Sequence, residues 1–265
     1  DKVNLSFLAN ASYVKNEIKN LGNQTGYIDK ESLPTLGTVS RNQNGYPIGY
    51  FFGYKAIGVF QTQEEIDNYI SPATGKPIQP NAVPGDTKFE DLNGDGVISD
   101  DNEDRTMIGK PNPDWMVGLT VAADWNGFDL SAFFQGSFGA DVFDALRRYE
   151  LAAVNYTSDA LERWTGPGTS NSMPRIVLGD TPKNFRPSTL LVHDASFLRL
   201  RNLQVGYTLP AQLTRKAYIQ RLRFYASFDN LLTITGYKGM DPEIGSTMGI
   251  DKGVYPQARV YTFGL

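Results

Sequence analysis

The sequence predicts an all-β protein built from long antiparallel strands, and three observations support this prediction. The 265 residues include 14 Tyr, 15 Phe and 3 Trp together with 26 Gly and 15 Pro, a mixture that favours strands and turns over helices. Apolar and polar residues alternate with a period of two over several segments. No apolar run reaches the roughly 18 residues that a membrane helix needs. We therefore expect strands to form the architecture and exclude a helical membrane protein.

The clearest strand pair is a hairpin over residues 115–125 and 128–138. Both segments alternate, and they are separated by Asn126-Gly127, a dipeptide that strongly favours a two-residue hairpin turn. Such a turn fixes the register and places Trp115 opposite Phe138. In this register one side of the hairpin is apolar or small at every pair, whereas the other side is mostly polar or small.

The length of these strands predicts their environment. Ten steps of about 3.3 Å, tilted by roughly 40°, project to about 25 Å, the height of the lipid-facing band of an outer-membrane barrel. The alternative explanation is a soluble β-sandwich hairpin with one buried face. Strand length argues against it, because strands of soluble proteins are usually about five to six residues long and these run to about eleven. The side chains that we expect to face lipid are Trp115, Val117, Leu119, Val121, Trp125, Phe128, Leu130 and Phe134.

Five further segments repeat the alternation less cleanly and bring the expected total to about seven strands. These segments are residues 3–13, 50–60, 196–209, 223–231 and 257–265.

The connections between the expected strands alternate in length. The hairpin turn and residues 210–220 are short, whereas residues 62–113, 139–195 and 232–256 are long and rich in Gly, Pro, Asn and Asp. Short turns on one side and long loops on the other are typical of outer-membrane barrels. We therefore predict a segment of an antiparallel transmembrane β-barrel with long extracellular loops. Residues 14–48 do not fit, because the alternation places them on the short-turn side.

Charge and composition exclude several function classes. The 25 Lys and Arg against 29 Asp and Glu give a net charge of -4, so the broad basic field that nucleic-acid binding needs is missing. The absence of cysteine excludes disulfides, thiolate metal sites and cysteine nucleophiles. A catalytic triad would have to use His193, the only histidine, and no carboxylate pair is singled out for glycoside hydrolysis. We therefore do not expect an enzyme.

An acidic segment resembles a calcium-binding loop. Asp91-Leu92-Asn93-Gly94-Asp95-Gly96 matches the first half of an EF-hand loop, with oxygen ligands at positions one, three and five and glycine at six. Position twelve, however, is Asn102 instead of an acid. The pattern favours a structural Ca²⁺ ion over a solvated acidic turn, and no helix pair flanks it as in a calcium sensor. The expected ligands are Asp91, Asn93, Asp95, Val97, Ser99, Asp101 and Glu103.

Four aromatic residues in the long loops are candidates for contact with a substrate or partner. Their rings could stack on sugars or peptide side chains, although loop aromatics more often serve packing. They are Tyr149, Tyr156, Trp164 and Tyr237.

A series of short motifs follows in order along nearly the whole chain. They include Pro47-Ile48-Gly49-Tyr50-Phe51-Phe52-Gly53-Tyr54, the Asp91–Gly96 segment, Gly206-Tyr207-Thr208-Leu209-Pro210, Asp229-Asn230-Leu231-Leu232 and Asp241-Pro242-Glu243. In this order they resemble the C-terminal half of SusC/RagA-type TonB-dependent transporters. That family's fold is a 22-stranded outer-membrane barrel with an N-terminal plug, usually capped by a SusD-like surface lipoprotein.

The resemblance implies a place and a function for the chain. About seven strands cannot close a 22-stranded barrel, so residues 1–265 are expected to be the C-terminal part of the barrel, with the plug and the N-terminal strands absent from this chain. The function implied is uptake of oligosaccharides or peptides across a Gram-negative, Bacteroidetes-like outer membrane, energised through TonB and assisted by a SusD-like lipoprotein. The alternative is a secreted or surface β-sandwich that binds glycan, and a hydrolase ranks third.

Overall fold

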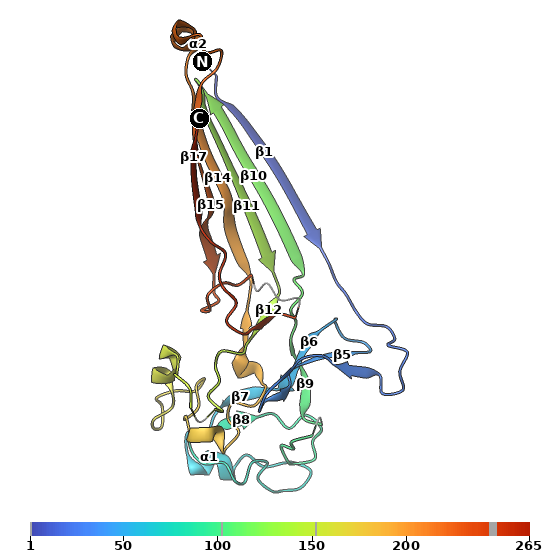
Figure 1. Cartoon of the computed structure of the whole chain (residues 1–265). Helices are drawn as coiled ribbons and strands as arrows, with labels where there is room; N and C mark the ends of the chain where they lie inside the picture. Colours follow the sequence, from blue (N-terminus) through green and yellow to red (C-terminus); the bar gives the residue numbers. More distant parts are fainter. Residues whose placement is uncertain (1, 102, 152, 244–247) are drawn as a thin grey trace.

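The computed structural model of the chain consists of a long sheet with a loop assembly at one end (Figure 1). It describes residues 2–101, 103–151, 153–243 and 248–265. The sheet has six antiparallel strands in the order β1-β10-β11-β14-β15-β17. Their bounds are β1 (Asn4–Tyr13), β10 (Trp115–Trp125), β11 (Phe128–Phe138), β14 (Phe197–Thr208), β15 (Arg223–Thr235) and β17 (Val260–Gly264). The predicted fold class, an antiparallel barrel segment, is confirmed.

Helices are few and short. Among the residues described, no helix has both the length and the apolar character needed to cross a membrane. The helices are α1 (Gln63–Asp67), α2 (Ala211–Thr214), η1 (Ser158–Glu162), η2 (Leu178–Asp180), η3 (Thr189–Leu191) and η4 (Arg215–Ala217).

The β10–β11 hairpin has the predicted bounds and register. Trp115 lies opposite Phe138, and the pairing continues without interruption to the turn. Asn126 and Gly127 adopt φ angles of 52° and 86°, as the tight turn requires. A Cβ at Gly127 would also lie 2.7 Å from the carbonyl oxygen of Thr208, so close packing of the neighbouring strand adds a second reason for glycine.

The prediction that residues 50–60 form a strand of the large sheet is wrong. This segment forms β6 (Tyr50–Tyr54) and β7 (Ala56–Val59), which belong to two smaller sheets. All five residues of β6 are buried, so the strand has protein on both faces. A run of aromatic residues fits such a position as well as it fits a barrel wall, and the sequence does not distinguish the two.

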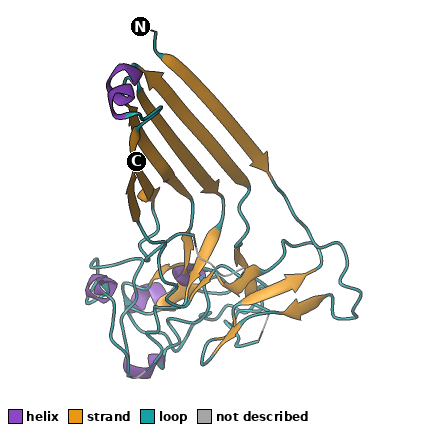
Figure 2. Cartoon of the chain, turned by 45° about the horizontal axis from the view of Figure 1, so that its top comes forward, coloured by secondary structure: helices purple, strands orange, loops and turns teal. Residues whose placement is uncertain are grey.

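This correction removes the difficulty with residues 14–48. Because β1 pairs directly with β10, residues 14–114 form one long connection. It leaves the sheet at the same end as residues 139–196 and 236–259, whereas the two short connections lie at the opposite end (Figure 2). The alternation of short turns and long loops therefore holds throughout the sheet.

The long connections fold together into one assembly. It holds a four-stranded sheet, a three-stranded sheet and two strand pairs. Its core combines Val39 and Phe51 from the first connection with Phe143 and Leu191 from the second and Ile250 from the third. The remaining strands are β2 (Tyr27–Asp29), β3 (Ser32–Leu33), β4 (Gly37–Thr38), β5 (Ser40–Gln43), β8 (Thr87–Phe89), β9 (Arg105–Gly109), β12 (Asp141–Asp144), β13 (Val192–Asp194) and β16 (Ile250–Asp251).

Candidate functional site

The two faces of the large sheet have opposite chemical character across all six strands. Paired residues follow one another from strand to strand, so each row of the register belongs to one face. One apolar row consists of Phe7, Val121, Ala132, Leu203, Phe228 and Tyr261. The next row, on the other face, consists of Ser6, Ala122, Ser131, Gln204, Ser227 and Thr262.

All eight side chains that the sequence predicts to face lipid lie on the apolar face. Trp115, Trp125 and Phe128 are about half exposed, and the five others are exposed or partly exposed. The alternation therefore assigns the correct face to each of them. Contact of this face with lipid remains a prediction.

Aromatic side chains mark both ends of the apolar face. At the short-turn end, Phe128 lies 6.5 Å from Trp125 and 4.4 Å from Tyr207 between ring centroids. At the loop end, the rings of Tyr13 and Trp115 are 5.0 Å apart. Ten residue steps separate the two ends of β10, about 33 Å at the usual rise of a strand. Two aromatic rows around an apolar band are the pattern of outer-membrane strands at the two membrane surfaces.

The polar face carries a buried ion-pair cluster next to the loop assembly. Arg199 is 2% exposed, and its guanidinium donates to Asp241 at 2.5 Å, to Glu243 at 2.9 Å and to Thr233 at 2.9 Å. Arg201, also on β14, pairs with the same Glu243 at 2.5 Å. The cluster thereby fastens the connection between β15 and β17 to the polar face of the sheet.

The carboxylate of Asp241 is held in its charged form. Burial raises the pKa of Asp241, but hydrogen bonds from the backbone N–H groups of Gln257 and Glu243, together with Arg199, outweigh burial and leave this pKa below its ordinary value. The sequence shows the two arginines and the Asp241-Pro242-Glu243 motif separately. The sequence alone does not predict that they pair, because about 40 residues separate the partners and only the folded chain brings them together.

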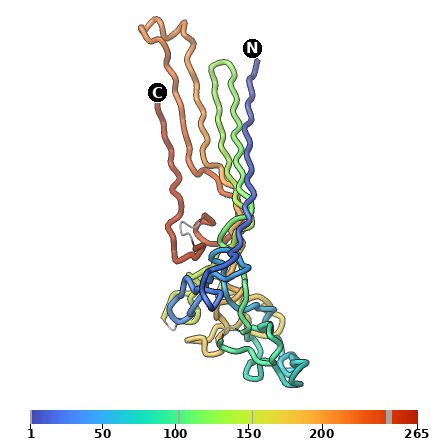
Figure 3. The backbone as a smooth tube through the Cα atoms, turned by 90° about the vertical axis from the view of Figure 1, so that its right-hand side faces the viewer, coloured from blue at the N-terminus to red at the C-terminus, as the bar shows by residue number. Residues whose placement is uncertain are grey.

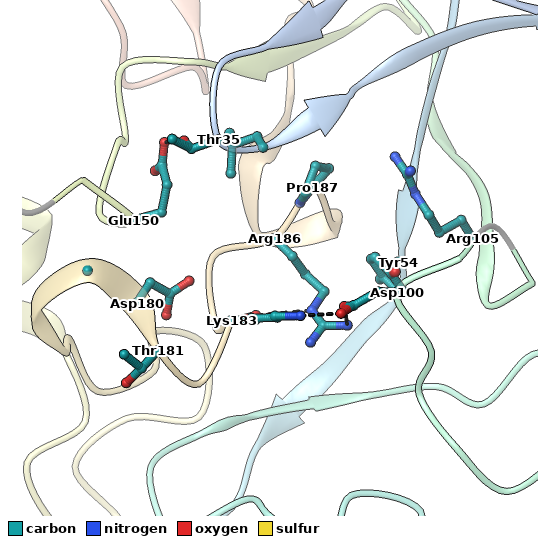
Figure 4. Close-up of a pocket in the computed structure, with 12 residues that line it drawn as sticks. Thr35, Tyr54, Asp100, Arg105, Glu150, Asp180, Thr181, Lys183, Arg186 and Pro187 are labelled. Carbon is teal, nitrogen blue, oxygen red and sulfur yellow. Dashed lines mark hydrogen bonds and ion pairs between the residues drawn. The ribbon is translucent and has the colours of Figure 1, made fainter.

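The loop assembly contains a charged pocket of about 490 Å³ (Figure 4). Glu150 and Asp180 lie at one side of it, and Lys183, Arg186 and Arg105 lie at the other, where Asp100 pairs with Lys183 and Arg186. Such a lining suits a polar ligand that carries both donor and acceptor groups. No local pattern of the sequence points to this pocket, because it is formed by five separate stretches of the first and second long connections.

Asp180 is the most strongly perturbed acid of this pocket. Burial raises the pKa of Asp180 to about 6, although the backbone N–H groups of Phe185 and Asn184 donate to its oxygens at 2.8 and 2.9 Å. The protonated form is therefore present at mildly acidic pH.

The structure places three of the four candidate loop aromatics in packing contacts. Tyr149 is buried 4.7 Å from the ring of Phe185, and the hydroxyl of buried Tyr237 donates to Asp251 at 2.7 Å. The ring of Trp164 packs against Gly85, where an added Cβ would lie 2.4 Å away. In this structure these rings stabilise the loop assembly, and stacking on a ligand would need their release.

The fourth candidate, Tyr156, differs from the other three. The residue is 44% exposed, and its ring lies 5.5 Å from that of Tyr149. Of the four, it is the most exposed. Contact of Tyr156 with a substrate or partner remains a prediction.

The acidic loop is closed by its own hydrogen bonds. The two carboxylate oxygens of Asp91 accept from the backbone N–H groups of Gly94 and Gly96 at 2.7 and 2.9 Å. Buried Asp104 accepts from the backbone N–H groups of Leu92 and Ser99 at 3.1 and 3.0 Å. Asp104, which was not among the expected ligands, is thus the carboxylate that joins the two ends of the loop.

The expected calcium ligands do not converge as a set of oxygen donors. Asn93 directs its amide nitrogen at Asp95 and Glu103, 3.0 Å from each carboxylate. Within the described part of the chain, no three His, Cys, Asp or Glu side chains are grouped as a metal site, and Asn102 lies outside that part. The carboxylates of Asp95 and Asp101 instead accept from the backbone N–H groups of Val97 and Glu103. In this arrangement the carboxylates accept hydrogen bonds from within the loop, and calcium binding remains an untested prediction.

Comparison with known proteins gives one consistent group of relatives. No family model matches the chain. TonB-dependent receptor P3 of Formosa agariphila is 34% identical over 84% of this chain and 22% of its own length. TonB-dependent receptor SusC of Bacteroides thetaiotaomicron is 30% identical over 97% of this chain and 23% of its own length. The chain thus spans about a quarter of the length of these relatives.

Solved structures agree with the sequence relatives. The structure of the RagAB peptide transporter matches with a TM-score of 0.73 and 26% identity, over 98% of this chain and 27% of the matched chain. The RagAB peptide importer in its open-open state matches with a TM-score of 0.71 and the same identity, over 98% of this chain and 26% of the matched chain. The relatives are receptors and transporters, not enzymes. Over nearly its whole length the chain is homologous to TonB-dependent receptors of the SusC/RagA type, and it has the fold of part of their barrel and loops.

Proposed function

We propose that this chain forms part of the wall and the outer loops of a nutrient importer in a Gram-negative outer membrane. The observation that carries the proposal is the large sheet itself. Its apolar face is bounded by aromatic rows, its other face is polar, and its short turns and long loops lie at opposite ends. These are the properties of strands between lipid and a water-filled interior.

The exposed apolar face disfavours the β-sandwich alternative. Phe7, Ile234 and Phe263 are each at least 60% exposed, and they belong to regular rows rather than to scattered positions. A sandwich needs a second sheet on this face, and within the described part of the chain none of the smaller sheets lies there (Figure 1). Lipid chains can cover this wide apolar face, because they adapt to its shape and need no second sheet.

The polar face and the loop assembly would then serve the substrate. Residues such as Gln135, Asn202 and Gln204 would line the interior of the barrel, and the loop assembly would lie outside the membrane, next to a SusD-like lipoprotein. The substrate would be an oligosaccharide or a peptide, and TonB would supply the energy. The family relationship supports these assignments, and the RagAB neighbours are peptide transporters by name.

Fractionation of the native host tests the proposal. We expect peptides of this chain in the outer-membrane fraction, within a polypeptide several times heavier than 29.3 kDa. Disruption of its gene should abolish growth on one class of oligosaccharide or peptide, and loss of TonB should have the same effect. A secreted species of 29.3 kDa that needs no detergent would contradict the proposal and favour the sandwich.

A further inference from the structure

The connection between β14 and β15 is the longer of the two connections at the short-turn end. It comprises residues 209–222, includes α2 and η4, and projects beyond the neighbouring β10–β11 hairpin (Figure 3). Its backbone is closed internally, because the N–H of Leu209 donates to Leu222 at 2.9 Å and the N–H of Ile219 donates to Thr214 at 3.1 Å. Most of its residues are exposed, and Thr214 is buried.

The turn carries uncompensated positive charge. Residues 209–222 contain three basic residues and no acidic residue, although the chain as a whole has a net charge of -4. Arg215, Lys216 and Arg221 are exposed, and across the described ranges no carboxylate lies within ion-pair distance of them. The nearby Arg223, in contrast, pairs with Asp129.

Apolar side chains accompany these charges. Tyr218 is 98% exposed and adopts a φ of 60°, an uncommon conformation for a residue with a side chain of this size. Leu213 is 57% exposed, and Ile219 is exposed as well. Short helical segments that combine basic residues with exposed aromatic and aliphatic residues are typical of segments that lie in a membrane interface.

The turn is continuous with the aromatic edge of the apolar face. Tyr207 and Phe224 form the second residue pair from the turn, after Thr208 and Arg223. Phe128 lies on the next strand beside Tyr207. The phosphate groups of a bilayer lie just beyond the aromatic belt of a membrane protein. The three basic side chains therefore lie at the level of the lipid phosphate groups if the apolar face spans the membrane.

We propose that residues 209–222 bind the headgroups of anionic phospholipids in the leaflet that faces the short turns. The inference rests on the proposed membrane position of the sheet and adds a defined lipid site to it. Arg215, Lys216 and Arg221 contact the phosphates, and Tyr218 inserts its ring among the headgroups. Charge complementarity and continuity with the apolar face favour lipid over a protein as the occupant.

Lipid titration of the full-length receptor tests this site. Phosphatidylglycerol is added to the purified receptor, and binding is measured by native mass spectrometry, with phosphatidylcholine as the uncharged comparison. The variant Arg215→Gln/Lys216→Gln/Arg221→Gln should bind phosphatidylglycerol at least about tenfold more weakly.

The matched control neutralises three exposed lysines of the loop assembly, Lys15, Lys30 and Lys76, and should bind as the unmodified receptor does. Arg215→Lys/Arg221→Lys retains the charge and should retain the affinity. Unchanged binding by the triple variant, or an equal loss in the control, would overturn the site.

A crosslinking measurement separates this inference from the proposed function. A photoreactive benzoylphenylalanine replaces Tyr218 in one receptor variant and Phe134, on the apolar face, in another. We expect both variants to crosslink to phospholipid in native membranes. Crosslinking of lipid at position 134 but only of protein at position 218 would refute the headgroup site and leave the membrane position intact. No lipid at position 134 would refute both.

Discussion

At the scale of single residues, Arg199 is the side chain on which the polar face depends most. It is buried and pairs with two acids of one connection, so its removal leaves the carboxylate of Asp241 without its closest cation. Breaking a buried ion pair from one side typically costs about 3–5 kcal/mol. We therefore expect Arg199→Gln to lower the free energy of unfolding by about this amount and to expose residues 236–243 to protease.

An exposed ion pair provides the control for Arg199. Lys252 pairs with Glu31 at 3.0 Å, and the Lys252 side chain is 54% exposed. Exposed pairs contribute about 0–1 kcal/mol, so Lys252→Gln should leave both unfolding and protease resistance nearly unchanged. Urea unfolding with limited proteolysis measures both effects. Equal behaviour of the two variants would contradict the role assigned to Arg199.

Asp180 gives the pocket a predictable pH dependence. Because burial raises its pKa in the folded state to about 6, well above the ordinary value of an aspartate, the folded state binds the proton more tightly than the unfolded state does. The contribution of Asp180 to stability is therefore fully present below the unfolded pKa and is lost as the pH rises through the folded pKa. Hydrogen exchange of residues 180–185 should become faster between about pH 4 and pH 6, after correction for the intrinsic rate. Asp180→Asn should remove this pH dependence, and its persistence in the variant would assign it to another group.

At the scale of elements, the two faces of β10 offer a matched pair of substitutions. Leu119 lies on the apolar face near the middle of the strand, and Thr120 lies beside it on the polar face. An arginine near the bilayer midplane costs about 2–4 kcal/mol on the lipid face of a barrel. Leu119→Arg should therefore reduce assembly and stability in membranes far more than Thr120→Arg does. Similar effects of the two substitutions would argue against the lipid-facing assignment.

The acidic loop permits a direct test of the calcium prediction. If Ca²⁺ binds, a chelator should lower the melting temperature of the receptor. The variant Asp91→Ala/Asp95→Ala should then have a lowered melting temperature without chelator, and chelator should lower it no further. If the loop is held by hydrogen bonds alone, the chelator should have no effect on either protein. The second result agrees with the present geometry, in which Asp91 accepts two backbone N–H groups. It would end the calcium hypothesis.

The strands differ in how well the sequence could predict them. The hairpin register was predictable because Asn126-Gly127 specifies a turn locally, and each pair then follows from counting. Residues 50–60 were misassigned because their aromatic side chains fit the wall of a barrel as well as they fit β6, where every residue is buried. Burial on both faces depends on segments that arrive from elsewhere in the chain.

At the scale of the whole molecule, the sequence determines the division between wall and loops but not the contacts among the loops. Arg199 meets Asp241 only because both the sheet and the third connection are formed, and no local signal encodes that meeting. The same holds for the charged pocket, where Tyr54, Glu150 and Lys183 come from distant segments. The alternation of the sequence predicts only which face of the sheet each side chain of a strand occupies.

The central claim is that the large sheet separates lipid from a polar interior. Spin-label accessibility along β10, Trp115–Trp125, tests it most directly, because the chain contains no cysteine that would compete for labelling. Single labels are placed on successive residues of the receptor in lipid bilayers, in a background without other cysteines. The account predicts that odd positions are accessible to oxygen, which partitions into lipid, and even positions to a water-soluble nickel complex, in opposite phase. Equal access of the nickel complex to both sets of positions would contradict it.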